Sequence, residues 1–484
     1  MKHFIMVHPM KKLIEVRSGA SLLQTLRATG ISMDAPCGGR GSCGKCKVLV
    51  NETIQHACQV FIHTDLEVTL LHESKFEVLA EGLEIVAEYD PVKQGFLLAF
   101  DIGTTTVAGY LLDQRTGQEL ALDSIPNPQA SYGADVVSRI QYAVKDTENT
   151  LTVCIRDALT SMTRRLCRKA DISSSQISVV SIVGNSAMQQ LFLGICPHNL
   201  AAIPFLPMLT EAKTVPAKDV LPCCEHAQIL IVPDIAGFIG ADTVAGILAT
   251  RLDGQQSPAL LVDIGTNGEM VLCDDGRMVA CATAAGPALE GANIQFGMRG
   301  AQGAIDHVWL ENGQIRYHVI GDVDAVGICG SGLIDAVSVA LEAGWINSRG
   351  RILDNSRKII LSDTVYLTQQ DIRQVQLAKG AIAAGIRLMA DDLGLEVADI
   401  QKVFLAGAFG TFMNPDSACR IGLLPQEFAG KIIAAGNAAG SGAKLLACNK
   451  ELFKKTQRLA QRVKHLNLAL TPGFQRCFAE NMRF

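Results

Sequence analysis

The chain has 484 residues, of which 48% are hydrophobic and 19% are charged, and its 43 basic and 48 acidic residues give a formal net charge of −5. This composition excludes a disordered chain, which would be poorer in apolar residues, and argues against a nucleic-acid-binding protein, which would carry a basic excess. At about 150 residues per domain, the length predicts three folding units. No run of about 18 uncharged apolar residues occurs and the N-terminus lacks a signal-peptide pattern, so we expect a cytoplasmic protein without a membrane partner.

Residues 1–75 predict a small domain that contains a glycine-rich cysteine loop. Alternating apolar residues predict a β-hairpin at the start of the chain, followed by a helix that Ser18 caps and Gly30 ends. Further strands are predicted at 47–50 and 67–71. This order of hairpin, helix, loop and strands is typical of a small β-grasp domain.

Four of the fifteen cysteines gather in and just after this loop, namely Cys37, Cys43, Cys46 and Cys58. The glycines around them let the backbone wrap closely around a bulky centre and direct N–H groups at anionic sulfurs. The spacing C-x5-C-x2-C, with a fourth cysteine after eleven more residues, resembles the adrenodoxin-like variant of the [2Fe-2S] ferredoxin loop. Structural zinc, the alternative, usually takes two paired C-x2-C units. We predict a [2Fe-2S] cluster on these four ligands and expect the other eleven cysteines to be packing residues.

An internal repeat follows an acidic, aperiodic connector at 76–94 and predicts two similar halves, 95–257 and 258–484. The core D-I-G-T occurs at 101–104 and again at 263–266, each time between an apolar strand and an alternating strand. In such a turn, glycine amides and a threonine hydroxyl can contact phosphate, and the aspartate can hold Mg²⁺ or its water shell. Two such hairpins predict a clamp for Mg-ATP, with the expected contacts Asp101, Gly103, Thr104, Thr105, Asp263, Gly265, Thr266 and Asn267.

Three further glycine-rich stretches are candidates for the same site. Residues 403–409 form an apolar strand that ends on Gly407, and with Gly410 they leave room for a flat adenine base. Gly330 and Ser331 open a helix whose free N–H groups can bind an anion, and Asn185 or Ser186 opens another, although such helix starts are also common for structural reasons.

These motifs, in this order, resemble the actin, sugar-kinase and Hsp70 superfamily, in which duplicated ribonuclease-H-like halves close on ATP. The predicted fold class is therefore α/β and β-grasp: an N-terminal [2Fe-2S] ferredoxin-like domain followed by a duplicated ribonuclease-H-like ATPase domain.

The pairing of a ferredoxin with a duplicated ATPase resembles the corrinoid-activating proteins, also called reductive activators of corrinoid proteins. The likeness covers nearly the whole chain and includes N-P-Q-A-S-Y-G-A-D-V-V-S-R-I at 127–140, P-D-I-A-G-F-I-G-A-D at 233–242 and T-Q-Q-D-I-R-Q-V-Q-L-A-K-G-A-I at 368–382. Some members carry an extra domain between ferredoxin and ATPase, and its absence here leaves open whether the chain forms a homodimer.

This resemblance implies an ATP-dependent, one-electron reduction of inactive Co(II) to Co(I) in the corrinoid protein of a methyltransferase system. The cluster would pass the electron, a low-potential donor would supply it, and Asp101 and Asp263 would bind Mg-ATP with the two Gly–Thr turns. Either Asp263 or Glu269 would orient the attacking water.

Three other functions remain open from the sequence. A small-molecule kinase would need an acceptor and would ignore corrinoid proteins. A nucleotide-gated redox sensor would bind ATP without multiple turnover. An activator of a radical enzyme would keep the chemistry, but such activators usually hold one [4Fe-4S] cluster between subunits.

Overall fold

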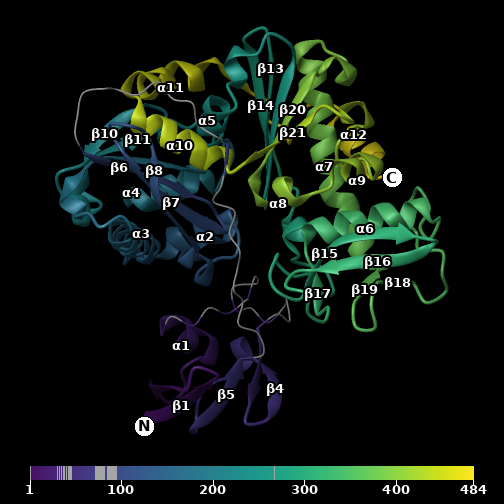
Figure 1. The fold of residues 1–484 in the computed structure, drawn as a ribbon, viewed down its shortest axis with the longest axis horizontal. Coiled ribbons are helices and arrows are strands. Elements are labelled where there is room, and N and C mark those ends of the chain that lie inside the picture. Colours follow the sequence, from purple (N-terminus) through teal and green to yellow (C-terminus); the bar gives the residue numbers. More distant parts are fainter. Residues whose placement is uncertain are drawn as a thin grey trace.

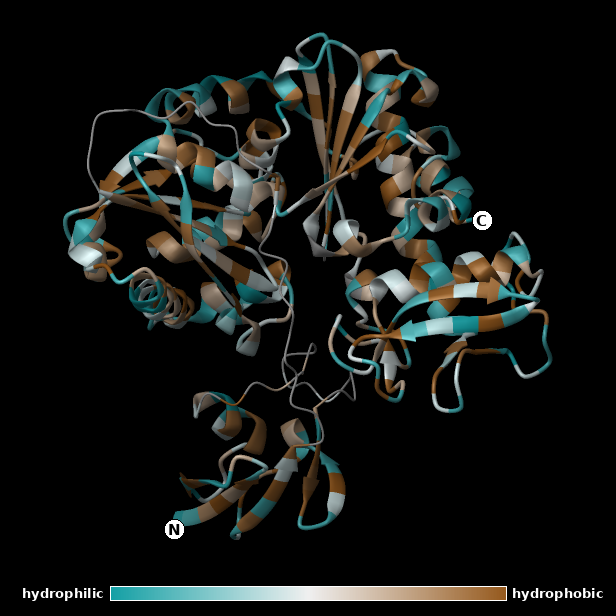
Figure 2. Ribbon diagram, viewed as in Figure 1, coloured by the Kyte–Doolittle hydropathy of each residue, from teal (hydrophilic) through white to brown (hydrophobic). Residues whose placement is uncertain are grey.

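The computed structural model describes residues 2–29, 31, 33, 35, 39, 41, 46–70, 82–83, 95–265 and 267–484. Its strands form one five-stranded sheet near the N-terminus and two six-stranded sheets in the rest of the chain (Figure 1). The strands of the two larger sheets are mainly apolar, whereas exposed helix faces are hydrophilic (Figure 2). No helix in these residue ranges is long and apolar enough to cross a membrane.

The N-terminal sheet has the order β2-β1-β5-β3-β4, with β1 and β5 parallel and the other neighbours antiparallel. Helix α1 packs its leucines against this sheet. The helix begins after Ser21 and not after Ser18 as predicted, because Gly19 has φ +85° and belongs to a turn. Gly30, the predicted end, lies outside the described residues. The elements are β1 (Lys2–His8), β2 (Lys12–Arg17), α1 (Leu22–Ala28), β3 (Lys47–Val50), β4 (Thr53–His56), η1 (Ala57–Gln59) and β5 (Leu66–Leu70).

The second sheet has the order β10-β11-β9-β6-β7-β8. Strands β6, β7 and β8 form an antiparallel meander, and β9 and β11 continue the sheet parallel to β6. The elements are β6 (Phe96–Ile102), β7 (Thr106–Asp113), β8 (Glu119–Pro126), η2 (Pro128–Ser131), α2 (Val136–Lys145), α3 (Thr150–Lys169), η3 (Ser174–Gln176), β9 (Ile177–Gly184), α4 (Ser186–Leu193), η4 (His198–Leu200), β10 (Lys213–Pro216), η5 (Ala217–Asp219), η6 (Pro222–Cys224), β11 (Gln228–Ile231), α5 (Ala241–Ala249) and η7 (Leu252–Gly254).

The third sheet, ordered β21-β20-β12-β13-β14-β22, repeats this plan with a meander β12-β13-β14 and the parallel strands β20 and β21. Two small sheets, β16-β15-β17 and β18-β19, are inserted after β14 and were not predicted. The elements are β12 (Ala259–Ile264), β13 (Gly268–Asp274), β14 (Arg277–Thr283), η8 (Pro287–Glu290), β15 (Ala304–Glu311), β16 (Gln314–Val319), β17 (Gly327–Ile328), α6 (Gly330–Glu342), β18 (Lys358–Ile360), β19 (Tyr366–Thr368), α7 (Gln369–Leu393), η9 (Val397–Asp399), β20 (Lys402–Ala406), α8 (Gly407–Phe412), α9 (Pro415–Arg420), η10 (Gln426–Phe428), β21 (Ile432–Gly436), α10 (Ala438–Cys448), α11 (Lys450–Arg462), β22 (Val463–His465) and α12 (Phe474–Asn481).

The two large sheets share one hydrophobic layer. Helix α5 follows β11 and helix α10 follows β21, so the two helices are equivalent, and they pack against each other between the sheets. The duplicated architecture confirms the predicted fold class. Helix α11 ends at Arg462, because Val463–His465 leaves the helix and pairs with β14 as an edge strand.

Candidate functional site

Asp101 lies near the carboxyl end of β6, and its carboxylate accepts a hydrogen bond from across the interface between the sheets. The donor is Asn437 Nδ2, 2.9 Å from Asp101 Oδ2, and the same amide group lies 3.2 Å from the Tyr110 hydroxyl. Burial raises the pKa of Asp101 to about 7, although the Asn437 hydrogen bond opposes this and the charges of nearby aspartates add to it. Asn437 is fixed as the N-cap of α10, where its Oδ1 accepts from Gly440 N at 2.6 Å.

Asp263 occupies the equivalent place on β12 and lies directly opposite Glu269 on β13. Residues opposite each other in an antiparallel pair have their side chains on the same face of the sheet. Burial and the Asp242 charge raise the pKa of Asp263 to about 7, and burial with the charges of Asp242 and Asp263 raises that of Glu269 well above its usual value. Within the described part of the chain, Asp263 has no hydrogen-bond partner. Two close carboxyl groups of this kind favour a cation between them.

Asp242, in the first turn of α5, was not singled out as a site residue from the sequence. Its charge raises the pKa of four other carboxyl groups, so it lies close to all of them: Asp101, Asp234, Asp263 and Glu269. Burial raises its own pKa to about 6. The sequence shows an acidic residue in the first turn of an apolar helix, but not which strand end that turn faces. Asp242 therefore joins a set of electrostatically coupled carboxyl groups that both halves supply, although no three acidic, histidine or cysteine side chains in the described residues are already placed to hold a metal ion.

Asp234 is a second acidic residue that the sequence did not single out. It follows β11, is 3% exposed, and neither oxygen of its carboxyl group has a hydrogen-bond partner of standard geometry in the described structure. Burial raises its pKa well above the usual value, although the nearby Ser186 hydroxyl and Ala241 N–H oppose this effect. Burial of this kind favours the protonated acid.

The first hairpin is held by side chains from three surrounding segments. Asn127 Nδ2 donates to Gly103 O at 2.8 Å, and the fully buried Arg139 donates to Thr104 O at 2.6 Å. Asn185, the N-cap of α4, donates to Thr104 Oγ1 at 2.9 Å. The structure thus places Asn185 against the predicted phosphate turn. Hydrogen bonds from protein side chains therefore hold the turn between β6 and β7.

The second hairpin is linked to the first through Glu290 of η8. Thr105 Oγ1 lies 3.3 and 3.4 Å from the two carboxylate oxygens of Glu290. The turn itself closes with a bond from Gly265 N to Asn267 O at 2.9 Å. Thr266 lies outside the described residues, so the predicted contact at that position stays a prediction.

Gly407 and Gly184 are equivalent residues at the ends of β20 and β9. Gly407 has φ +84°, and a Cβ there would lie 2.6 Å from Asp263 Oδ1. A Cβ on Gly184 would lie 2.6 Å from Ile102 O, next to Asp101. In each half, a glycine lets a parallel strand end directly against the hairpin aspartate. Gly407 therefore lies at the second aspartate, and its predicted contact with the nucleotide stays a prediction.

The remaining residues predicted to contact the nucleotide pack closely against other parts of the protein. A Cβ on Gly410 would press against Leu405, and one on Gly330 would lie 1.9 Å from Leu289 O, so both glycines allow close packing. Ser331 is buried and its hydroxyl lies 3.3 Å from Cys329 Sγ, at the start of its own helix. The predicted contact of Ser331 with a phosphate stays a prediction.

The cysteine loop is described at two of its four predicted ligands. Cys46 is buried and Cys58 is half-buried, and burial together with the neighbouring Cys58 raises the pKa of Cys46 to about 11. A Cβ on Gly39, which has φ +88°, would lie 3.8 Å from Cys58 Cβ, so the loop backbone runs close to this sulfur. Cys37 and Cys43 lie outside the described residues. The adjacent thiols and the close backbone fit a cluster bound inside the loop.

Gly82, within the segment that joins the ferredoxin-like sheet to the ATPase halves, contacts the carboxylate site. It forms an antiparallel bridge with Gly436, and a Cβ there would lie 2.6 Å from Asn437 O. Asn437 is the residue that holds Asp101. One described point of the connector therefore lies beside the first aspartate.

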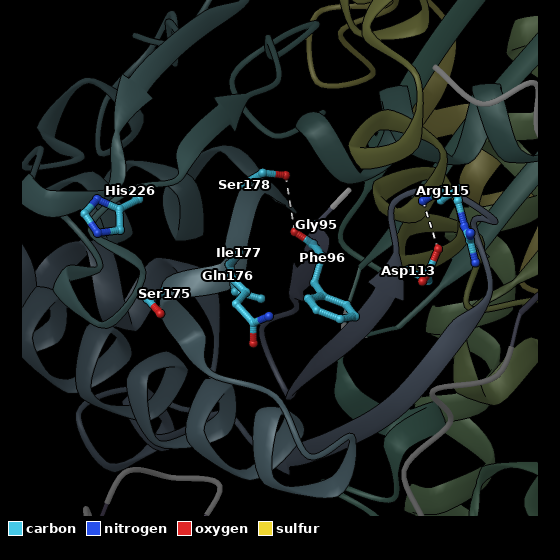
Figure 3. Close-up of a pocket in the computed structure, with 9 residues that line it drawn as sticks. All are labelled: Gly95, Phe96, Asp113, Arg115, Ser175, Gln176, Ile177, Ser178 and His226. Atoms are coloured by element: carbon cyan, nitrogen blue, oxygen red, sulfur yellow. Dashed lines mark hydrogen bonds between the residues drawn. The ribbon is translucent and has the colours of Figure 1, made fainter. Parts of the chain in front are cut away.

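A pocket in the first half lies at the wrong end of the sheet for nucleotide. It is lined by residues at the start of β6 and β9 and the end of β7, including Phe96, Asp113 and Ser178 (Figure 3). The aspartates lie at the opposite, carboxyl ends of the parallel strands, where ligands bind in open α/β sheets.

Comparison with known proteins agrees with this arrangement. Family models match in chain order: a 2Fe-2S iron-sulfur cluster binding domain at 5–71, the RACo middle region at 96–255 and the C-terminal ASKHA domain of RACo at 257–484. The chain is 35% identical over 442 residues to the corrinoid activation enzyme RamQ of Eubacterium limosum, covering 85% of this chain and 74% of that protein. The chain belongs to the family of corrinoid-activating proteins.

Two further members of this family of corrinoid-activating proteins are more distant. The [Co(II) methylated amine-specific corrinoid protein] reductase of Methanosarcina barkeri is 27% identical over 412 residues, covering 78% of this chain and 75% of that protein. A solved structure of a reductive activator for corrinoid, iron-sulfur protein is 26% identical with a TM-score of 0.74, covering 100% of this chain and 98% of that one.

Proposed function

We propose that this protein uses ATP to reduce the inactive Co(II) form of a corrinoid protein to Co(I), as part of a methyltransferase system. The observation that carries the proposal is the set of coupled carboxyl groups supplied by both ATPase halves, in a chain whose family members are named for corrinoid activation. The [2Fe-2S] cluster, when bound, supplies one-electron transfer at about −400 mV for plant-type clusters.

The nucleotide site is assigned to the two hairpins. Asp101 and Asp263 would hold Mg²⁺ or its waters, and the turn amides with Thr104 and Thr105 would contact the phosphates. Asp242 joins Asp263 and Glu269 as a carboxylate able to orient the attacking water. The adenine would lie against the glycine-lined end of β20.

Electron transfer to Co(II) runs uphill, so ATP must favour a state in which the cobalt is easier to reduce. A movement of the two halves relative to each other would provide this change of state, because each half contributes groups to the same site. The bridge of Gly82 to Gly436 offers a route from this movement to the ferredoxin-like domain.

The proposed domain division is a ferredoxin-like domain at 1–75, a connector at 76–94, and ATPase halves at 95–257 and 258–484. The proposed cluster ligands are Cys37, Cys43, Cys46 and Cys58. A low-potential protein or small molecule would donate the electron, and the reaction would take place in the cytoplasm. Whether the chain acts as a homodimer is a separate question that its mass in solution answers.

The test combines the purified protein, a Co(II) corrinoid protein, a low-potential reductant and Mg-ATP, and follows the visible spectrum. The Co(II) band should disappear only when ATP is present. In Asp263→Asn, adding ATP should no longer cause the Co(II) band to disappear. Cys46→Ser should abolish reduction of Co(II) while leaving ATP binding unchanged. Cys196→Ser, at an exposed cysteine outside the loop, is the matched control and should behave as wild type. An unchanged Co(II) band with intact cluster and bound ATP would overturn the proposal for that partner.

A small-molecule kinase is the alternative function for the same cleft. It predicts ATP hydrolysis that depends on a hydroxyl or carboxyl acceptor and is indifferent to corrinoid protein. ATP turnover measured with the corrinoid protein alone separates the two, because only the activator turns over without an acceptor.

A further inference from the structure

Two neighbouring cysteines in the first ATPase half form a cluster that the proposed function does not use. Cys223 and Cys224 end the short helix η6, and their sulfurs lie 3.9 Å apart. Cys224 is completely buried, whereas Cys223 is partly exposed. They precede β11, at the end of the sheet opposite the carboxylates, so the pair is separate from the nucleotide site.

One face of α3 packs against η6 and surrounds Cys223 with polar groups. Thr160, Thr163, Arg164 and Cys167 recur at the i, i+3, i+4 and i+7 spacing of a single helix face. Thr163 is 0% exposed, and its hydroxyl has no hydrogen-bond partner of standard geometry in the described structure. A buried hydroxyl without a fixed partner beside a sulfur is free to donate to a thiolate.

The groups around Cys223 all favour its anionic form. A hydrogen bond from Cys224 lowers the pKa of Cys223, and the Thr160 and Thr163 hydroxyls and the Arg164 charge lower it further, against the opposing effect of burial. For Cys224 the direction is reversed, because its hydrogen bond to Cys223 and its own burial raise the pKa. These directions, with Cys223 partly exposed and Cys224 buried, favour the thiolate at Cys223 and the thiol at Cys224, the combination that thiol–disulfide chemistry uses.

We propose that Cys223 is a reactive thiolate that hydroperoxides and soft electrophiles modify, and that Cys224 is its resolving thiol. In the first step the Cys223 sulfur attacks a peroxide oxygen, an S–O bond forms, the O–O bond breaks, and the leaving oxygen takes a proton to become water or an alcohol. In the second step the Cys224 sulfur attacks Cys223, an S–S bond forms, and water leaves with the Cys224 proton. Two thiols lose two electrons and one peroxide gains them.

The disulfide between adjacent residues is expected to be readily reversible. The Cα atoms of adjacent residues are about 3.8 Å apart across a trans peptide, shorter than the usual 4.4–6.8 Å of a disulfide. Such a bond is strained and therefore easily reduced, so the pair would cycle whenever a thiol reductant is present.

The first test labels the full-length reduced holoprotein with limiting iodoacetamide and measures each cysteine by mass spectrometry after trypsin digestion. Cys154 is the matched control, since it lies on α3, is also partly exposed, and has a pKa that burial raises to about 11. Cys223 should react about tenfold faster or more than Cys154, because thiolate fraction outweighs the lower nucleophilicity of a more acidic thiol. Equal rates would overturn the proposal.

The second test treats the same protein with hydrogen peroxide. Adjacent cysteines share the tryptic peptide 219–251, whereas Cys167 lies in 166–168, so a disulfide within the pair removes two hydrogens from one peptide without joining two. Cys224→Ser should accumulate a Cys223 sulfenic acid that dimedone traps, and Cys223→Ser should trap nothing at Cys224. A cross-link to peptide 166–168, or no dimedone adduct on Cys223, would overturn the proposal. The wild-type measurements stand even where a variant fails to fold.

Discussion

The hairpin that carries Asp101 and the hairpin that carries Asp263 share a sequence core and occupy equivalent places in their sheets, but the other half of the molecule presents a different group to each. The charge of Asp242 at the start of α5 acts on both aspartates, but Asp101 also receives a hydrogen bond from Asn437 at the start of α10. The opposing residue on the partner strand also differs, being Ala108 in the first half and Glu269 in the second.

This difference indicates that the two similar turns have different roles. The first hairpin is built as a fixed support, with its aspartate and its turn carbonyls already bonded to protein groups. The second collects carboxylates that repel one another until a cation enters. We infer that the first half positions the phosphates and that the second half responds to Mg-ATP.

The largest expected effect comes from Asp263→Asn. The change keeps the shape of the side chain but removes the charge that the cation needs, so kcat for ATP hydrolysis should fall about 100-fold or more. Steady-state phosphate release in the presence of corrinoid protein measures it. Asp253→Asn, at an exposed aspartate in the first half, is the control. An unchanged kcat would mean that the second hairpin is not the responsive one.

The second-largest effect is expected from Asn437→Asp. This change places a carboxyl group beside the aspartate of the first hairpin, as is already the case in the second hairpin. Aspartate can still cap α10, but it can no longer donate to Asp101, and a charge-assisted hydrogen bond of this type contributes about 1.5–3 kcal/mol. ATP hydrolysis should fall about tenfold at low Mg²⁺ and recover in part at high Mg²⁺. A titration of the rate against Mg²⁺ measures this, with Asn449→Asp, at the N-cap of α11, as the control. A fall that Mg²⁺ does not relieve would contradict the charge argument.

A pH series on metal-free protein tests the repulsion directly. The pKa values of Asp101 and Asp263 are raised to about 7 and that of Asp242 to about 6, above their usual value of 3.8. The folded protein then binds more protons than the unfolded chain between about pH 4 and pH 7, so the free energy of unfolding should decrease as pH rises through that window.

In that series, Asp242→Asn should reduce the loss of unfolding free energy by about 1–2 kcal/mol, because it removes one titrating group and the repulsion on its neighbours. Denaturant unfolding at pH 5 and pH 7.5 measures both proteins. Asp101→Asn removes a carboxyl group whose pKa is higher, at about 7, and should reduce the loss further. An unfolding free energy of the wild type that is equal at the two pH values would contradict the repulsion.

The sequence was sufficient for the duplicated fold because D-I-G-T repeats at equivalent strand ends and each copy carries its own apolar strands. It also located both aspartates, since their positions follow from the repeat. Asp242 and Asn437 were not found, because each acts across the interface on the hairpin of the other half, and no local pattern reveals which helix start faces which strand end. Ser331 was chosen by local pattern alone; its hydroxyl lies 3.3 Å from Cys329 Sγ, and its contact with an anion stays a prediction.

The smallest expected effect comes from Thr105→Val, which removes the hydrogen bond that joins the first hairpin to Glu290 of the second half. The contact is long, at 3.3–3.4 Å, and only partly buried, so its loss should weaken ATP binding by about 0.5–1 kcal/mol, or about threefold in KM, with little change in kcat. Thr105→Ser keeps the hydroxyl and is the matched control. A loss of kcat in the valine variant alone would show that this contact transmits the ATP state between the halves. The model of a supporting and a responsive hairpin would then need a third element that connects them.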